Sequence, residues 1–147
     1  ELKTPVYTVA FRILWDRALA EDVMQEVFLR LFRRPPGPEV RNPRAFIFRM
    51  ARNLAIDSRR KPMQAALAQD DAEAVRPSPE EANVLRLDVE RALAALPVDA
   101  REMLALNINA GLKFREIADI LGIPLGTALW RYQKAIGSLR ELLSGGM

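Results

Sequence analysis

Arginine side chains gather between residues 41 and 60, and most of them recur at spacings of three, four and seven. On an α-helix these spacings bring side chains to one face. Guanidinium groups on one face can hold phosphate oxygens, and the interleaved rings of Phe46 and Phe48 can stack on unpaired bases. A solvated helix whose Phe residues are core is the alternative. The basic residues of this stretch, together with Asn53, are Arg41, Arg44, Arg49, Arg52, Arg59 and Arg60.

A second polar stripe precedes it, between residues 21 and 29. Asp22, Gln25 and Glu26 fall on one helix face at spacings of three and four, with Leu29 alongside. Such a face can dock on a basic partner surface, although an ordinary solvated helix face has the same appearance.

The segment from Phe114 to Thr127 has the layout of a helix-turn-helix. A short helix directs Ile117, Ala118 and Leu121 inward, Gly122 makes the tight turn, and a longer helix follows. In a major groove, the first half of that second helix could reach phosphates and base edges. We call its polar and aromatic residues the recognition group: Thr127, Trp130, Arg131, Gln133 and Lys134.

Composition excludes several kinds of chemistry. The chain has no cysteine and no histidine, which excludes disulfides, thiolate or imidazole metal sites, and Ser–His or Cys–His catalysis. We therefore expect no metal, no cofactor, no small-molecule substrate and no enzymatic activity. Charge is uneven: residues 1–61 hold 13 Lys and Arg against 7 Asp and Glu, whereas residues 80–147 hold 8 against 9. The first segment is therefore the first place to expect nucleic acid.

These side chains must be positioned by helices, because apolar residues recur at three and four almost everywhere and no strand pattern appears. We expect helices at about 6–14, 19–32, 43–60, 78–96, 99–109, 114–121 and 125–143. Prolines end several of them, and Asn42-Pro43 and the capping box at Ser78 start two others. The prediction is an all-α chain of two small helical domains, 1–61 and 78–147, joined by a linker at 62–77.

No apolar run approaches the roughly 20 residues needed to cross a bilayer. The first residues also lack the pattern of a signal peptide. A cytoplasmic protein is the expectation.

Three collinear motifs resemble the extracytoplasmic-function (ECF) sigma factors of bacterial RNA polymerase. The run from Ala20 to Leu31, AEDVMQEVFLRL, resembles their core-polymerase-binding segment. The run from Arg41 to Asp57, RNPRAFIFRMARNLAID, followed by Arg59-Arg60, resembles the segment that melts and reads the minus-ten element, and NPRAF is similar to the iron-uptake branch. Leu96-Pro97, Arg101-Glu102, Gly111-Leu112 and the helix-turn-helix resemble the domain that reads the minus-thirty-five element.

The resemblance implies a sigma region 2 bundle followed by a sigma region 4 helix-turn-helix. It implies that a docking group, Asp22, Gln25, Glu26 and Leu29, binds the clamp of the polymerase's largest subunit, with further contact at the flap region. It adds Asn42 to the arginine-rich set, and we call the result the strand-binding group: Arg41, Asn42, Arg44, Arg49, Arg52, Asn53, Arg59 and Arg60.

The same resemblance implies further partners and steps. The loop 35–42 would hold a flipped base of the non-template strand. The recognition group would read the minus-thirty-five element. An anti-sigma factor, often tethered to the inner membrane, would cover these surfaces, and the active chain would be found on the nucleoid.

The chain departs from the family pattern after Gly126-Thr127. Leu129 and Trp130 stand where the family has a basic residue and a small polar one, so two expected DNA-facing positions are apolar. A sigma-like decoy that binds an anti-sigma protein and never DNA is therefore an alternative. A helix-turn-helix repressor would leave the first two motifs unexplained, and no residue cluster suggests an all-helical enzyme.

Overall fold

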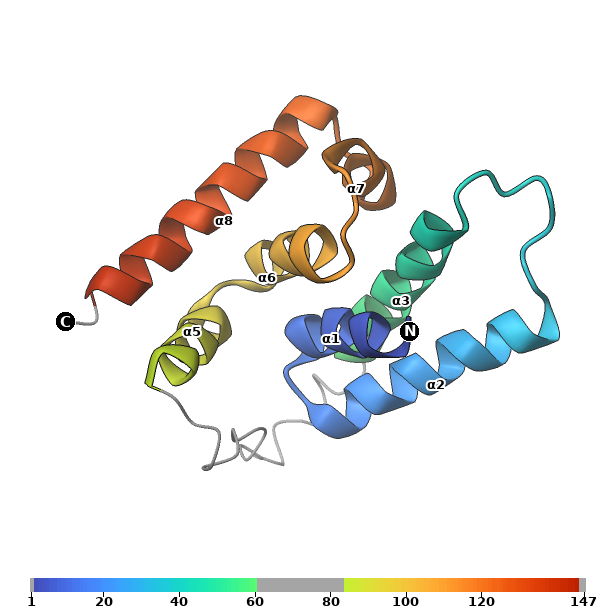
Figure 1. Cartoon of the computed structure of the whole chain (residues 1–147), viewed down its shortest axis with the longest axis horizontal. Helices are drawn as coiled ribbons and strands as arrows, with labels where there is room; N and C mark the ends of the chain where they lie inside the picture. The colour runs from blue at the N-terminus through green and yellow to red at the C-terminus, as the bar shows by residue number, and fades with distance from the viewer. Residues whose placement is uncertain (1, 61–83, 146–147) are drawn as a thin grey trace.

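The computed structural model describes residues 2–60 and 84–145 (Figure 1). The predicted linker at 62–77 and the capping box at Ser78 lie outside them. Every element in the described ranges is helical, as predicted. In chain order these are α1 (Lys3–Leu14), α2 (Arg17–Arg33), α3 (Pro43–Arg60), α5 (Val84–Ala95), α6 (Val98–Leu104), the π-helix η3 (Ala105–Asn109), α7 (Phe114–Leu121) and α8 (Leu125–Gly145).

The first two helices begin earlier than predicted. Pro5 lies in the first turn of α1, where a missing N–H leaves no intrahelical bond unmade, so the helix includes it. Asp16 caps α2, because its carboxylate accepts a hydrogen bond from the backbone N–H of Leu19 (3.0 Å).

Helix α3 begins where Asn42-Pro43 predicts. The side-chain oxygen of Asn42 accepts from the backbone N–H of Ala45 (3.1 Å), which confirms Asn42 as the cap. Phe48 is 0% exposed and Phe46 packs half-buried against the core. Base stacking by Phe48 is therefore wrong, since its ring already lies among apolar side chains.

The helix predicted over 99–109 is interrupted. After α6 the backbone widens into η3, where the N–H of Ala110 donates to the carbonyl of Ala105 (2.9 Å), a five-residue spacing. Gly111 then turns the chain with a φ of 71°, a conformation that costs glycine little. In α7 the residue buried beside Ile117 and Ala118 is Ile120; Leu121, predicted to point inward, is only half-buried.

The two helical halves pack on each other. Helix α1 contacts α2 and α3 on one side and α6 and η3 on another, and α7 lies near the start of α3 (Figure 1). One core cluster includes Val6 and Ile13 from the first half and Met103, Leu106 and Ile117 from the second. A smaller cluster of Leu96, Leu104 and Ala135 holds α8 to α6. In this conformation the two halves therefore share a core.

Candidate nucleic-acid interface

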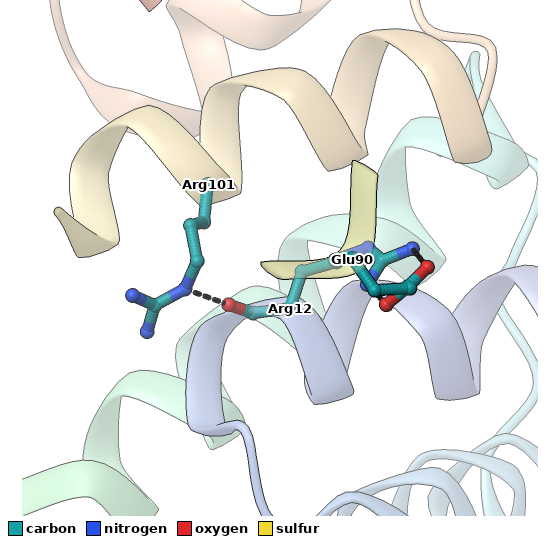
Figure 2. Close-up of polar contacts among 3 residues, drawn as sticks. All are labelled: Arg12, Glu90 and Arg101. Carbon is teal, nitrogen blue, oxygen red and sulfur yellow. Dashed lines mark hydrogen bonds and ion pairs between the residues drawn. The ribbon is translucent and has the colours of Figure 1, made fainter. Parts of the chain in front are cut away.

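Arg101 of α6 joins the two halves at the end of α1. Its guanidinium donates to the backbone carbonyl of Arg12 (2.5 Å; Figure 2). It also donates to the backbone carbonyls of Ile13 (3.1 Å) and, in its own half, of Leu96 (2.6 Å). The last carbonyls of a helix have no partner within the helix and carry its negative dipole end. A cation from the second half thus caps the C-terminus of α1.

The surroundings of Arg101 are aromatic and crowded with positive charge. Its guanidinium carbon lies 5.6 Å from the centre of the Trp15 ring, and that of Arg12 lies 5.4 Å from the same ring. Burial lowers the pKa of Arg101, and the charges of Arg59 and Arg12 lower it further. Arg12 itself forms a two-point ion pair with Glu90 of α5, at 3.0 and 3.2 Å (Figure 2).

A second set of contacts joins the start of α3 to the second half. Asn42 donates to the carboxylate of Glu116, and the Nε of Arg44 donates to the carbonyl of Ala110 (2.9 Å). One turn further along α3, Arg49 donates to the carbonyl of Asp119 (3.3 Å).

The strongest of these contacts is the ion pair between Arg52 and Glu102. The Nε and Nη2 atoms of Arg52 donate to the two carboxylate oxygens, at 2.8 and 3.4 Å. Glu102 is only 4% exposed and is the one buried charged residue in the described part of the chain. A buried carboxylate requires a partner, and Arg52 supplies a paired set of donors.

The strand-binding group is therefore only partly brought together. Asn42, Arg44, Arg49 and Arg52 donate hydrogen bonds to the second half, and of these Arg44 and Arg49 remain exposed. Arg41, Asn53 and Arg59 are exposed as well. The side chain of Arg60 lies outside the described part of the structure.

The docking group lies on the outer face of α2. Asp22, Gln25 and Leu29 are exposed, Leu29 by 42%, and Glu26 pairs with Arg30 one turn on (2.7 Å). An open, mainly apolar hollow of about 660 Å³ lies beside them. It is lined by Leu2, Lys3, Met24, Gln25, Phe28, Leu29 and Phe32.

The recognition group lies on α8. Trp130, Gln133 and Lys134 are exposed, and Thr127 and Arg131 are half-buried. The ammonium of Lys134 lies 5.0 Å from the centre of the Trp130 ring. Leu129 is 39% and Trp130 is 58% exposed, so both face outward in this structure rather than into the core.

Sequence reasoning missed the residues that join the halves. Sequence spacing predicts no contact for Glu90, Arg101 or Glu102, because each of them meets a partner at least 50 residues away. The burial of the Glu102 carboxylate, which only the structure reveals, is the signal that it must have a partner. No cluster of His, Cys, Asp and Glu that could hold a metal occurs in the described ranges. Nor is any helix there long and apolar enough to span a membrane.

Comparison with known families gives two matches in the predicted order. Residues 1–63 match the family model of sigma-70 region 2, and residues 86–139 match that of sigma-70 region 4. The chain is 34% identical to the ECF RNA polymerase sigma factor SigL of Mycobacterium tuberculosis, over 94% of this chain and 82% of that protein. It is 28% identical to the ECF sigma factor SigW of Bacillus subtilis, over 96% and 84% of the two chains.

Two solved structures share the arrangement of both halves. The sigma factor RpoE of Bartonella quintana, in complex with the anti-sigma factor NepR, has a TM-score of 0.77 at 23% identity, covering 97% of this chain and 92% of RpoE. CnrH, in complex with the cytosolic domain of CnrY, has a TM-score of 0.70 at 21% identity, covering 99% of this chain and 84% of CnrH. The chain belongs to the ECF sigma factors of RNA polymerase, as the three motifs predicted.

Proposed function

We propose that this sigma factor binds core RNA polymerase through α2, holds the opened minus-ten strand on α3 and reads the minus-thirty-five element with α8. The observation that carries the proposal is the matching of region 2 and region 4 in one chain, with a predicted binding group on each. The chain itself supplies binding and positioning, and the polymerase supplies the chemistry.

The docking group suits a protein partner. Its carboxylates give it a negative rim, and Leu29 beside the apolar hollow gives it a residue that can be buried on contact. Interfaces draw most of their affinity from apolar or aromatic anchors inside such a polar rim. We propose the clamp of the polymerase's largest subunit as the partner of α2, and the flap region as a partner of the second half.

The strand-binding group suits an opened DNA strand. Its arginines can hold phosphates, while the loop 35–42 ahead of α3 would take the flipped base. With Phe48 in the core, phosphate contacts must supply more of the affinity than ring stacking does. This predicts a strong dependence of binding on salt concentration.

The recognition group suits a major groove. Gln133 and Lys134 project from the outer side of α8 together with Trp130 and can reach base edges or phosphates. Because Leu129 and Trp130 are exposed, apolar contact with thymine methyl groups is available to this helix.

An anti-sigma factor is proposed as a further partner. RpoE was determined with such a protein bound, and its similarity extends over both halves of this chain. By the same proposal the chain acts in the cytoplasm, on the nucleoid, or is held at the inner membrane by that partner.

Transcription reconstituted with core polymerase and a promoter library tests the function. The full chain should bind core polymerase and produce transcripts from a subset of promoters that share two elements. A charge-reversal variant, Asp22→Lys with Glu26→Lys, should lose polymerase binding, because both changes lie on the docking face. Asp99→Lys with Glu141→Lys, at exposed positions of the second half, is the matched control and should retain binding.

Failure of the full chain to bind polymerase would contradict the proposal. If the chain instead bound an anti-sigma protein and produced no transcripts, the decoy function would replace it. The exposed Leu129 and Trp130 are the residues that favour this second function.

A further inference from the structure

The surface of α3 that is proposed to hold DNA is the surface that contacts the second half. Four members of the strand-binding group donate hydrogen bonds across the junction. Their acceptors are the carboxylates of Glu102 and Glu116 and the backbone carbonyls of Ala110 and Asp119. All four acceptors come from the continuous segment from α6 to α7.

Like the phosphates of a nucleic-acid backbone, these acceptors offer oxygen atoms to the N–H donors of α3. Arginine binds a carboxylate and a phosphate by the same paired N–H donors. The Nε and Nη2 of Arg52 are already used by Glu102, so they cannot hold a phosphate at the same time. Arg44 and Arg49 keep exposed surface, but each has a donor engaged by a carbonyl oxygen.

Of the four acceptors, Glu102 makes the strongest contact with α3. It is buried, it meets Arg52 at two points, and it lies on α6, which also carries Arg101 at the end of α1. Separating the halves would expose Glu102 to water and free Arg52 together. Removing the carboxylate alone would leave Arg52 without its partner in the closed chain, which favours the open one.

We propose that the segment from α6 to α7 is an internal competitor for the DNA-binding surface of α3. In the closed chain its carboxylates and carbonyls occupy the donors that the opened promoter strand requires. DNA therefore binds only after the halves separate, and the apparent affinity of the free chain is the affinity of the open chain multiplied by the open fraction. The proposal rests on the proposed function of α3, and its test separates the two.

The test uses the full chain and a fluorescein-labelled single-stranded DNA 20-mer of mixed sequence, with affinity measured by anisotropy at low salt. Glu102→Gln should bind about tenfold more tightly than the unaltered chain, because it favours the open state. Asp99→Asn removes the same charge at an exposed site one turn earlier on α6, and should change affinity by less than about twofold. Equal affinities for Glu102→Gln and Asp99→Asn would overturn the competition.

A second variant guards against a folding defect in the first. Glu116→Gln removes the carboxylate that meets Asn42 but retains a residue that can cap α7 at the backbone N–H of Lys113. It should tighten DNA binding by about threefold, since it weakens a single contact. Far-UV circular dichroism and cooperative unfolding establish that each variant is folded.

Two arginine variants, made in the Glu102→Gln background, separate the competition from the proposed function. Arg52→Ala should remove much of the gain, because Arg52 is one of the four groups set free; retention of the full gain would overturn the competition. Arg41→Ala should weaken binding whether the chain is open or closed, because Arg41 is already exposed. If Arg41→Ala and Arg52→Ala both left affinity unchanged, the DNA-binding role of α3 would fail instead.

Discussion

The outer face of α2 and the face of α3 towards the second half belong to one helical bundle, yet they differ in what they offer a partner. On α2, Asp22, Gln25 and Leu29 are exposed, and the ion pair there, between Glu26 and Arg30, stays within the helix. On α3, Arg44, Arg49 and Arg52 each donate to an oxygen of the second half. One predicted binding surface is open and the other is already engaged.

The difference suggests an order of events. A partner that recognises α2 can bind the closed chain as it stands, whereas DNA must displace Glu102 and its neighbours from α3. The chain should therefore bind polymerase first and DNA second. Only the second step requires the free energy of separating the halves.

The largest expected effect comes from breaking the junction that makes the two surfaces different. Arg101→Ala removes three hydrogen bonds from a charged donor and leaves two carbonyls at the end of α1 without it. The free energy of unfolding should fall by about 3 kcal/mol. Urea denaturation measures it, with Arg140→Ala, an exposed arginine of α8, as the control. A loss no larger than that of the control would show that the junction contributes nothing to stability.

The next effect tests the open surface. Leu29→Asp places a charge in the centre of the docking group and should weaken polymerase binding about 30-fold, or about 2 kcal/mol. Stability should change little, because Leu29 is already 42% exposed. Affinity for core polymerase can be measured by biolayer interferometry. Ile108→Asp, at an exposed apolar residue of η3, should retain binding; an equal loss there would argue against a specific face on α2.

A smaller effect concerns the turn that joins α7 to α8. Gly122 has a φ of 69° and nothing lies near the position of an added Cβ, so Gly122→Ala should cost about 1 kcal/mol through backbone strain alone. Gly137→Ala, inside α8 and equally uncrowded, should instead stabilise the chain by about 0.5 kcal/mol. Thermal unfolding followed by circular dichroism compares them. The same sign for both would contradict the assigned turn.

The smallest expected effect is that of the ion pair on the open surface, which can be compared with the ion pair on the engaged surface. Glu26 and Arg30 are both well exposed, so Glu26→Gln should change the free energy of unfolding by less than about 0.5 kcal/mol. Glu102→Gln, whose side chain is 5% exposed, should cost about 2 kcal/mol or more. Urea unfolding of the two variants side by side measures the difference. Similar losses would mean that the Arg52–Glu102 ion pair contributes no more to stability than the exposed Glu26–Arg30 pair.

The sequence alone determined much of this protein. Apolar spacing placed Val6, Val9 and Ile13 on the buried face of α1, and Asn42-Pro43 marked the start of α3. These signals are local, since a cap or a helix face depends on residues within a few positions of each other. The three collinear motifs were enough to predict the family, and the family models agree.

What the sequence left open was decided by contacts between distant segments. Phe48 had the same spacing whether it stacked on bases or filled the core, and only the packing of α1 and α3 decided for the core. Asp99 and Glu102 are both acidic residues of α6, but one is exposed and the other is buried against Arg52. The pairing of two charges 50 residues apart depends on how the halves meet, and no local periodicity carries that information.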